Sequence, residues 1–321
     1  MSERETSKLP YVSVICPIYN GQHYVRILIE SLLGQDYPQD LYEIIIVDNN
    51  SQDRTRQIVS EYPVTLLEER QSQSSYAARN KGIAQARGEI LAFIDADCEA
   101  VAAWLKEGVK ALLSSSAYLL GGKMEFVYSA QPTAAEMFDS IAHMDFETTI
   151  REDGTMATAN LFVRAELFEK LGLFPQAVQS GGDIQWTGLA SRKGYKLVYA
   201  EKAAVRHPTR QIKELLKKRY RTGTGVPYRQ LGRGQSLGYV LLYMIYYILY
   251  VPIPWSQVRQ SVQRRGTKEM HKNLYRMMGI GFLCNLVGRL GTLTEVFRIL
   301  VGKGRRSKLR HFTVGGEKES K

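Results

Sequence analysis

Two aspartates separated by one residue, Asp95 and Asp97, directly follow the apolar run EILAFI. Asp48 follows a second apolar run, YEIIIV, and Asp53 stands five positions later. Carboxylate oxygens in such a group suit a hard cation, Mg²⁺ or Mn²⁺, which takes few protein ligands and completes its shell with phosphate oxygens and water. We therefore expect a divalent metal that binds a diphosphate. The alternative is structural, because a lone Asp-x-Asp is common and Asp48 and Asp53 also suit turns and helix caps.

The elements that must position these aspartates alternate along the first two hundred residues. Short apolar, β-branched runs predict strands at residues 11–16, 42–47, 64–68 and 89–94. Helical spacing of apolar residues predicts helices between them, at residues 24–32, 53–61 and 75–86. This alternation predicts a doubly wound, mostly parallel, Rossmann-like α/β sheet, in which ligands bind beyond the carboxyl ends of the strands. Because neither GxxxxGK[ST] nor GxGxxG follows the first strand, we expect no P-loop or dinucleotide site.

Five longer segments carry a resemblance to a known family. They are VSVICPIYNG (12–21), EIIIVDNNSQDRT (43–55), AARNKGIAQARGEILAFIDADC (77–98), TANLFVRAELFEKLGLF (158–174) and GGDIQWTGLASRKGYKLVYAEKAAVRH (181–207). In order and spacing they resemble the family 2 glycosyltransferases, which have the A-type nucleotide-sugar fold. The resemblance covers roughly residues 10–210. It departs at Asn49, where the family often has a second acid; because Asp48 is kept, we expect nucleotide binding to be kept as well.

The resemblance implies a donor site that contains a metal. The residues that would bind the nucleotide are Pro17, Tyr19, Asp48, Arg79 and Asp95. Asp97 would ligate the Mg²⁺ or Mn²⁺ that bridges the diphosphate of a UDP- or GDP-sugar, and His207 would complete the metal shell. Two of these residues have another interpretation: Arg79 as a charge on a helix surface, and His207 as a surface histidine beside a proline.

The resemblance also implies an acceptor side of the site. Asp183 matches the family's general base, which would take the proton of the acceptor hydroxyl. Trp186 and Asn160 are expected beside the acceptor. One base with no second carboxylate as nucleophile predicts direct displacement with inversion at the anomeric carbon. The alternatives are that Asp183 is a first-turn helix acid favoured by the helix dipole, and that Trp186 belongs to the core.

Composition and charge divide the chain unevenly. Of 321 residues, 44% are apolar and 23% charged, which excludes disorder for most of the chain, and the three scattered cysteines exclude a disulfide scaffold. The charged start MSERETSK is unlike a signal peptide. The net charge is +11, and residues 201–321 hold 25 of the basic residues against 6 acidic ones. We predict an N-terminal tail (1–9), a glycosyltransferase catalytic domain (10–210), a basic, apolar, helical membrane-associated region (211–302) and a basic flexible tail (303–321).

The basic third contains a long stretch without charge, between Arg233 and Arg259, with Pro252 and Pro254 near its end. Its apolar part, at 237–255, is long enough to span a bilayer and rich in tyrosine. Basic clusters lie on both sides of it, and positive segments stay on the cytoplasmic side. We therefore favour re-entrant or in-plane attachment to the cytoplasmic face of the cell membrane, with spanning helices as a second interpretation and a buried core helix as a third.

These observations favour an inverting glycosyltransferase of polysaccharide or cell-envelope biosynthesis. It would move a sugar from a nucleotide-sugar donor to a lipid-linked or polysaccharide acceptor at an anionic membrane. A nucleotidyltransferase that acts on a sugar phosphate is an alternative enzyme, since it also uses carboxylates and a metal on an α/β sheet. A non-enzymatic, basic membrane- or nucleic-acid-binding protein is the other alternative. The uncharged stretch argues against a nucleic-acid partner, which would need a continuous basic surface.

Overall fold

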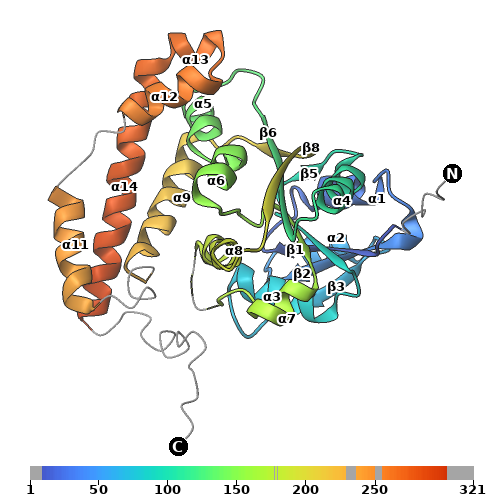
Figure 1. Cartoon of the computed structure of the whole chain (residues 1–321). Helices are drawn as coiled ribbons and strands as arrows, with labels where there is room; N and C mark the ends of the chain where they lie inside the picture. Colours follow the sequence, from blue (N-terminus) through green and yellow to red (C-terminus); the bar gives the residue numbers. More distant parts are fainter. Residues whose placement is uncertain (1–8, 177, 179, 229–235, 250–254, 302–321) are drawn as a thin grey trace, which may run out of the picture. The chain divides into compact units, whose positions relative to one another are not determined.

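The computed structural model describes residues 9–176, 178, 180–228, 236–249 and 255–301 (Figure 1). The chain forms two compact units. Unit 1 comprises Met1–Val127, Met144–Gln176 and Gly182–Pro208, and unit 2 comprises Tyr128–His143, Ala177–Gly181 and Thr209–Lys321. The predicted tails and the proline pair Pro252 and Pro254 lie largely or wholly outside the described residues, and the four-part division of the chain stays a prediction.

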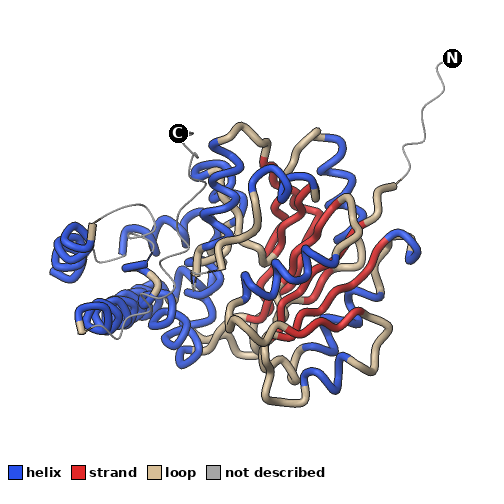
Figure 2. Tube along the Cα trace, turned by 90° about the horizontal axis from the view of Figure 1, so that it is seen from below, coloured by secondary structure: helices blue, strands red, loops and turns tan. Residues whose placement is uncertain are grey.

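Unit 1 is built on one eight-stranded sheet with the order β3-β2-β1-β4-β7-β6-β8-β5, seen as the strands in Figure 2. The strands are β1 (Val12–Ile18), β2 (Tyr42–Asp48), β3 (Thr65–Glu68), β4 (Ile90–Ile94), β5 (Glu99–Ala100), β6 (Leu119–Val127), β7 (Asn160–Arg164) and β8 (Leu197–Pro208). The strands β3, β2, β1 and β4 pair in parallel, as do β6 and β8. Strand β7 is antiparallel to β4 and β6, and β5 is antiparallel to β8. The predicted mostly parallel α/β fold is confirmed.

The helices of unit 1 connect these strands. They are α1 (Val25–Leu33), α2 (Thr55–Val59), α3 (Ser75–Gln85), α4 (Trp104–Ser114), α6 (Phe146–Asp153), α7 (Glu166–Leu171) and α8 (Gly182–Arg192), with a 3₁₀ turn η1 (Gln39–Leu41). All seven residues of β1 are buried, as expected of a parallel strand covered on both faces. Helix α1 buries Val25, Leu28, Ile29 and Leu32, which share one helical face. Local hydrophobic pattern therefore accounts for the scaffold that carries the strand ends.

Unit 2 is helical in its described residues. Its helices are α5 (Ala134–Ala142), α9 (Ile212–Thr224), α11 (Leu237–Leu249), α12 (Trp255–Arg265), α13 (Lys268–Lys272) and α14 (Leu274–Leu300). Buried side chains of α5, α9, α12 and α14 form its core, among them Phe138, Leu215, Val258 and Met277. Helices α9 and α14 approach very closely, because a Cβ atom added at Gly223 would stand 2.0 Å from a backbone oxygen of α14.

One helix of the described residues, α14, is long and apolar enough to cross a membrane, judged by its length and composition. The stretch from which we expected membrane attachment, residues 237–255, is described in two parts: α11, which has 13 residues, and Trp255, which begins α12. The sequence pattern shows only part of α14 as an apolar stretch, residues 277–287, because Arg289 and Glu295 interrupt the helix beyond it. Both of these side chains are buried within unit 2. Leu242, Ile245 and Tyr246 of α11 are exposed. The interpretation of this stretch as a buried core helix is therefore wrong for the face that these three residues form.

Candidate active site

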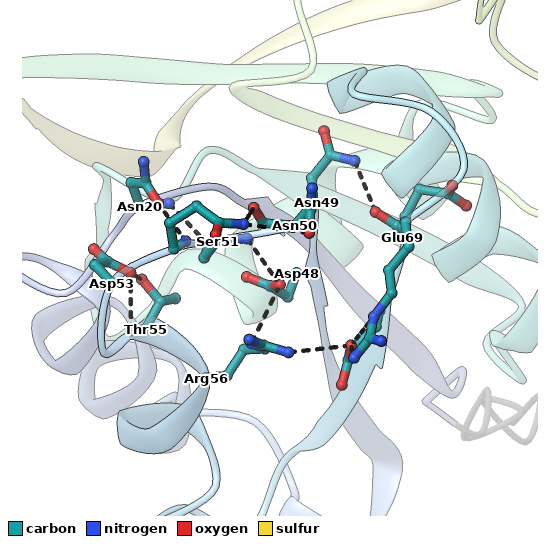
Figure 3. A network of polar contacts seen from close by, with 12 residues as sticks. Asn20, Asp48, Asn49, Asn50, Ser51, Asp53, Thr55, Arg56 and Glu69 are labelled. Atoms are coloured by element: carbon teal, nitrogen blue, oxygen red, sulfur yellow. Dashed lines mark hydrogen bonds and ion pairs between the residues drawn. The ribbon is translucent and has the colours of Figure 1, made fainter.

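The loops that follow β1 and β2 are tied together by hydrogen bonds (Figure 3). The backbone N–H groups of Asn20, Gly21 and Gln22 donate to Ser51 Oγ, Thr55 Oγ1 and Asp53 Oδ2, at 2.9, 2.8 and 3.1 Å. In return, the side-chain oxygen of Asn20 accepts a 2.8 Å hydrogen bond from the backbone of Gln52. Asp53 also caps the start of α2 through Thr55. Asp53 is thus a turn and cap residue, and it makes the first strand-end loop rigid.

Asp48 ends β2, and its side chain is almost completely buried. Its Oδ2 accepts a hydrogen bond of 3.1 Å from the backbone of Ser51 and lies 3.9 Å from Nε of Arg56. Its other oxygen, Oδ1, is buried without a hydrogen-bond partner among the described residues. Asp48 therefore shapes the turn, as the structural interpretation proposed, and its Oδ1 can still accept a hydrogen bond from a ligand.

Asn49, the position at which the resemblance departs, uses its amide as a donor. Nδ2 donates to the backbone oxygens of Glu69 and Ser72, at 3.2 and 2.8 Å (Figure 3 shows the bond to Glu69). A carboxylate cannot donate either bond. The amide therefore ties the end of β2 to the segment after β3, beside the loop that holds Asp48.

Arg79 of α3 forms an ion pair with Asp95, directly after β4. The arginine side chain is buried, so its interpretation as a helix-surface charge is wrong. Burial raises the pKa of Asp95 above its ordinary value, Arg79 opposes this rise, and the charges of Asp97 and Asp183 add to it. Asp97 and Asp183 of unit 1 are therefore close enough to Asp95 for their charges to act on it.

Asp97 and His207 come together although they are far apart in sequence. His207 Nε2 lies 3.2 Å from Asp97 Oδ2, and the ring's Nδ1 lies 2.6 Å from the backbone oxygen of Pro208. The imidazole is 1% exposed, so the interpretation of His207 as a surface histidine is wrong. A third of the Asp97 side chain is solvent-accessible. The pair thus offers one carboxylate and one imidazole at the edge of the sheet.

Asp183 lies in the first turn of α8 and is held by groups from two other segments. Its Oδ1 accepts a 3.0 Å hydrogen bond from the hydroxyl of Tyr76, and its Oδ2 accepts bonds of 3.0 and 3.2 Å from the backbone and hydroxyl of Thr158. Burial raises the pKa of Tyr76, and the Asp183 carboxylate adds to the rise. Tyr76 therefore remains a neutral phenol that donates to the carboxylate. Sequence reasoning missed Tyr76 and Thr158, and no local pattern marks either.

The remaining predicted site residues differ in their surroundings. Pro17 is buried within β1, and Tyr19, just after it, is half exposed. Trp186 is buried, stacks on Phe168 and donates a 2.7 Å hydrogen bond to the backbone of Gly172. Trp186 is therefore a core residue, as its alternative interpretation proposed.

Asn160 is completely buried at the start of β7. Its Oδ1 accepts a 2.8 Å hydrogen bond from the indole of Trp104, and its Nδ2 donates to the backbone oxygens of Lys123 and Ala203, both at 2.9 Å. The amide thus links β7 to β6, β8 and helix α4 through its own hydrogen bonds.

Comparisons with known proteins agree with this geometry. The family model described as Glycosyl transferase family 2 matches residues 13–157. The glycosyltransferase AglE of Haloferax volcanii is 36% identical over 299 residues, which make up 91% of this chain and 98% of AglE. A shorter match is to an Escherichia coli protein named UDP-Glc:α-D-GlcNAc-diphosphoundecaprenol β-1,3-glucosyltransferase WfgD. It is 30% identical over 119 residues, 36% of this chain and 46% of WfgD.

The fold also matches solved structures. The mannosyltransferase PcManGT from Pyrobaculum calidifontis, in complex with GDP-Man and Mn²⁺, has a TM-score of 0.58 at 18% identity, over 89% of this chain and 88% of that chain. The sheet and its strand-end acids thus define an A-type glycosyltransferase fold. The chain belongs to glycosyltransferase family 2, and it is an enzyme that uses a nucleotide sugar.

Proposed function

We propose that the chain is an inverting, metal-dependent glycosyltransferase that moves a sugar from a UDP- or GDP-sugar to a lipid-linked or polysaccharide acceptor of the cell envelope. One observation carries this proposal: the pair of Asp97 and His207 and the braced carboxylate of Asp183 belong to the same unit as Asp95, which feels the charge of all three. The donor diphosphate requires a metal ion that a carboxylate holds, and the acceptor hydroxyl requires a carboxylate as base. Both roles therefore require acids at one site.

The residues fit a divalent metal. Within the described residues, no group of three or more His, Cys, Asp or Glu side chains is placed to hold a metal ion. Asp97 and His207 supply two ligands, and Mg²⁺ or Mn²⁺ usually completes such a site with phosphate oxygens and water. An ion bound there would stabilise the negative charge of the leaving nucleoside diphosphate.

The donor and acceptor roles follow from the hydrogen bonds of each residue. Asp48, whose Oδ1 accepts no hydrogen bond from any described residue, and Tyr19 are proposed to bind the nucleoside, and Arg79 to hold Asp95 in place beside it. Asp183 is proposed to take the proton of the acceptor hydroxyl, with Tyr76 keeping the carboxylate in one orientation. A single base supports inversion at the anomeric carbon.

An exposed apolar stripe supports membrane attachment of unit 2. On α14 it is formed by residues spaced three or four apart, which lie on one helical face: Phe282, Leu286, Leu290, Leu293, Phe297 and Leu300. Basic residues of α12 and α13, among them Arg264, Arg265 and Lys272, belong to the same unit. Apolar burial together with attraction to anionic lipid favours in-plane or re-entrant attachment at the cytoplasmic face of the membrane.

The test is turnover by the purified full chain with UDP- and GDP-sugars, Mn²⁺ and a polyprenyl-diphosphate-linked sugar as acceptor. Nucleotide release and the mass of the product are followed. We expect Asp97→Asn and Asp183→Asn each to reduce turnover about 100-fold or more, because each removes a charge used in the transition state. We expect His207→Ala to raise the Mn²⁺ concentration needed for half-maximal turnover.

Glu99→Gln is the matched control, because Glu99 is a partly exposed acid two positions from Asp97 and pairs with Arg206. It should retain full turnover. If Asp97→Asn and Asp183→Asn retain it as well, the site assignment is wrong. Release of pyrophosphate from a nucleoside triphosphate and a sugar phosphate would instead identify a nucleotidyltransferase.

A further inference from the structure

Unit 2 contains a pocket of about 280 Å³ whose walls come mainly from α9 and α14. Lys218 and Arg219 line it from α9, Asn285 and Gly288 from α14, and His143 from the end of α5. Its volume is below that of a drug-sized ligand site and is ample for a phosphate or diphosphate group. None of its lining residues takes part in the active site described above.

Helices α9 and α14 cross closely at two glycines that line the pocket, so backbone forms part of its wall. Gly223 and Gly288 both line it, and a Cβ atom at Gly223 would stand 2.0 Å from the Gly288 oxygen. Thr292 of α14 donates a 2.9 Å hydrogen bond to the Gly223 oxygen, which locks the crossing. Larger side chains at these two positions would separate the helices or fill the space between them.

The pocket is positively charged. Lys218 and Arg219 line it, and the Nε atom of Arg219 is buried without a hydrogen-bond partner in the part of the chain that the structure describes. The neighbouring Asp139 is completely buried, and its Oδ2 forms an ion pair with Arg210 at 3.4 Å. Burial lowers the pKa of His143 well below its ordinary value, and the charges of Arg219, Lys218 and Arg210 lower it further. The histidine is therefore neutral, with Nδ1 3.6 Å from Asp139 Oδ1, and Lys218 and Arg219 supply the positive charge of the pocket lining.

We propose that this pocket binds the phosphate of a lipid-linked acceptor, with Lys218 and Arg219 as its cationic ligands. This inference rests on the proposed function. Arginine and lysine together are the side chains best suited to a phosphate, arginine through its fork of donors and lysine as a point charge. One wall belongs to α14, whose other face carries the exposed apolar stripe that suits a lipid phase. A phosphate attached to a lipid therefore suits this pocket better than a fully soluble anion does.

The experiment measures binding to the full chain in detergent micelles with three probes: a polyprenyl diphosphate, the corresponding polyprenol without phosphate, and inorganic diphosphate. We expect the polyprenyl diphosphate to bind most tightly. Lys218→Gln and Arg219→Gln should each weaken its binding about 10- to 100-fold, the usual loss of a hydrogen bond to a charged group. Arg219→Lys, which keeps the charge, should recover part of this loss.

Lys217→Gln is the matched control, because Lys217 is an exposed lysine on the same helix that does not line the pocket. It should bind as the parent chain does. Equal binding of the polyprenol and its diphosphate, or unchanged binding by both pocket variants, would overturn the proposal. If inorganic diphosphate binds as tightly as the lipid form, the pocket takes a free anion and the lipid assignment is wrong.

Nucleotide release without acceptor, measured on the same samples, separates this inference from the proposed function. Pocket variants should hydrolyse the donor at the parent rate, because they leave unit 1 unchanged, and thermal melting checks that each variant is folded. A parent chain that binds polyprenyl diphosphate but never releases nucleotide would contradict the proposed enzyme and leave the phosphate site standing. A chain that releases nucleotide but does not bind polyprenyl diphosphate would contradict only the phosphate site, and the proposed enzyme would stand.

Discussion

Replacing Asn49 by aspartate should strongly destabilise unit 1, although it introduces the acid that family 2 often has at this position. The Asn49 amide donates to the backbone oxygens of Glu69 and Ser72, and its side chain is 4% exposed. An ionised aspartate here could donate neither bond, and it would place a second buried charge next to Asp48. The Ser72 oxygen would keep its hydrogen bond from the backbone N–H of Ser74, but the Glu69 oxygen would lose the Asn49 donor. Loss of two part-buried hydrogen bonds costs about 1 kcal/mol each, and a buried charge without a donor costs about 1–3 kcal/mol more, so we expect a loss of about 3 kcal/mol or more. For a unit of this size that lowers the melting temperature by about 6 °C or more.

The assay compares thermal and urea unfolding of Asn49→Asp with Asn50→Asp. Asn50 is exposed, and its left-handed backbone (φ 67°) tolerates aspartate as well as asparagine. Its side-chain oxygen only accepts, from Gln52, so aspartate preserves the contact. Asn50→Asp should therefore unfold like the parent chain. Equal melting temperatures of the two variants at pH 8 would refute the role given to the Asn49 amide.

The pH dependence of the Asn49→Asp variant provides a second check. In its protonated form the introduced carboxyl group could donate one of the two lost hydrogen bonds, so its pKa in the folded state should exceed its unfolded value of about 4. The unfolded state then binds fewer protons than the folded state between these two values, and the variant loses stability as the pH rises through this range. We expect the difference from the parent chain to be smaller at pH 4.5 than at pH 8. A difference that grows toward acid pH would contradict this explanation.

Two further predictions concern unit 2. A double variant, Leu286→Asp with Leu290→Asp, should weaken binding to vesicles with anionic lipid about 10-fold or more. Each exposed leucine would contribute about 1.5–3 kcal/mol when it is buried in the membrane. Vesicle flotation measures this binding, and Ser114→Asp on unit 1 is the control. Gly223→Ala should destabilise unit 2 by about 1–3 kcal/mol, because the new methyl group meets backbone at 2.0 Å. Gly279→Ala, where no described atom lies within 4 Å of the added methyl group, should instead stabilise α14 by about 1 kcal/mol. Melting curves that change in the same direction for both glycines would contradict the close helix crossing.

The strand-end acids could be predicted because they depend on local pattern and on chain order. Buried apolar runs such as residues 12–18 and 90–94 mark parallel strands. Asp48 is the last residue of β2, and Asp95 and Asp97 come just after β4. Parallel strands place their carboxyl ends at one edge of the sheet, so the sequence already places these acids together. Burial could not be predicted, and for this reason Arg79 and His207 had a surface interpretation that the structure excludes.

The long helix α14 shows a second limit of pattern reading. Arg289 and Glu295 interrupt its apolar residues, and a hydropathy pattern treats such charges as boundaries. In the folded unit both side chains are buried, and Glu295 accepts a 2.6 Å hydrogen bond from Tyr228. Glu295 also pairs with Arg298 one turn further along α14, at 3.3 Å. The local sequence contains the arginine partner, but only the fold brings Tyr228 to this buried charge.

The sequence by itself determined the order of strands and helices and the residue types at the strand ends, because both follow from periodicity along the chain. The tertiary structure decided which of these residues act together. Tyr76 meets Asp183 across 107 positions, and Asp97 meets His207 only because β5 and β8 lie side by side. Hydrogen bonds and ion pairs act over about 3 Å in space whatever the separation in sequence, so only the folded chain reveals them.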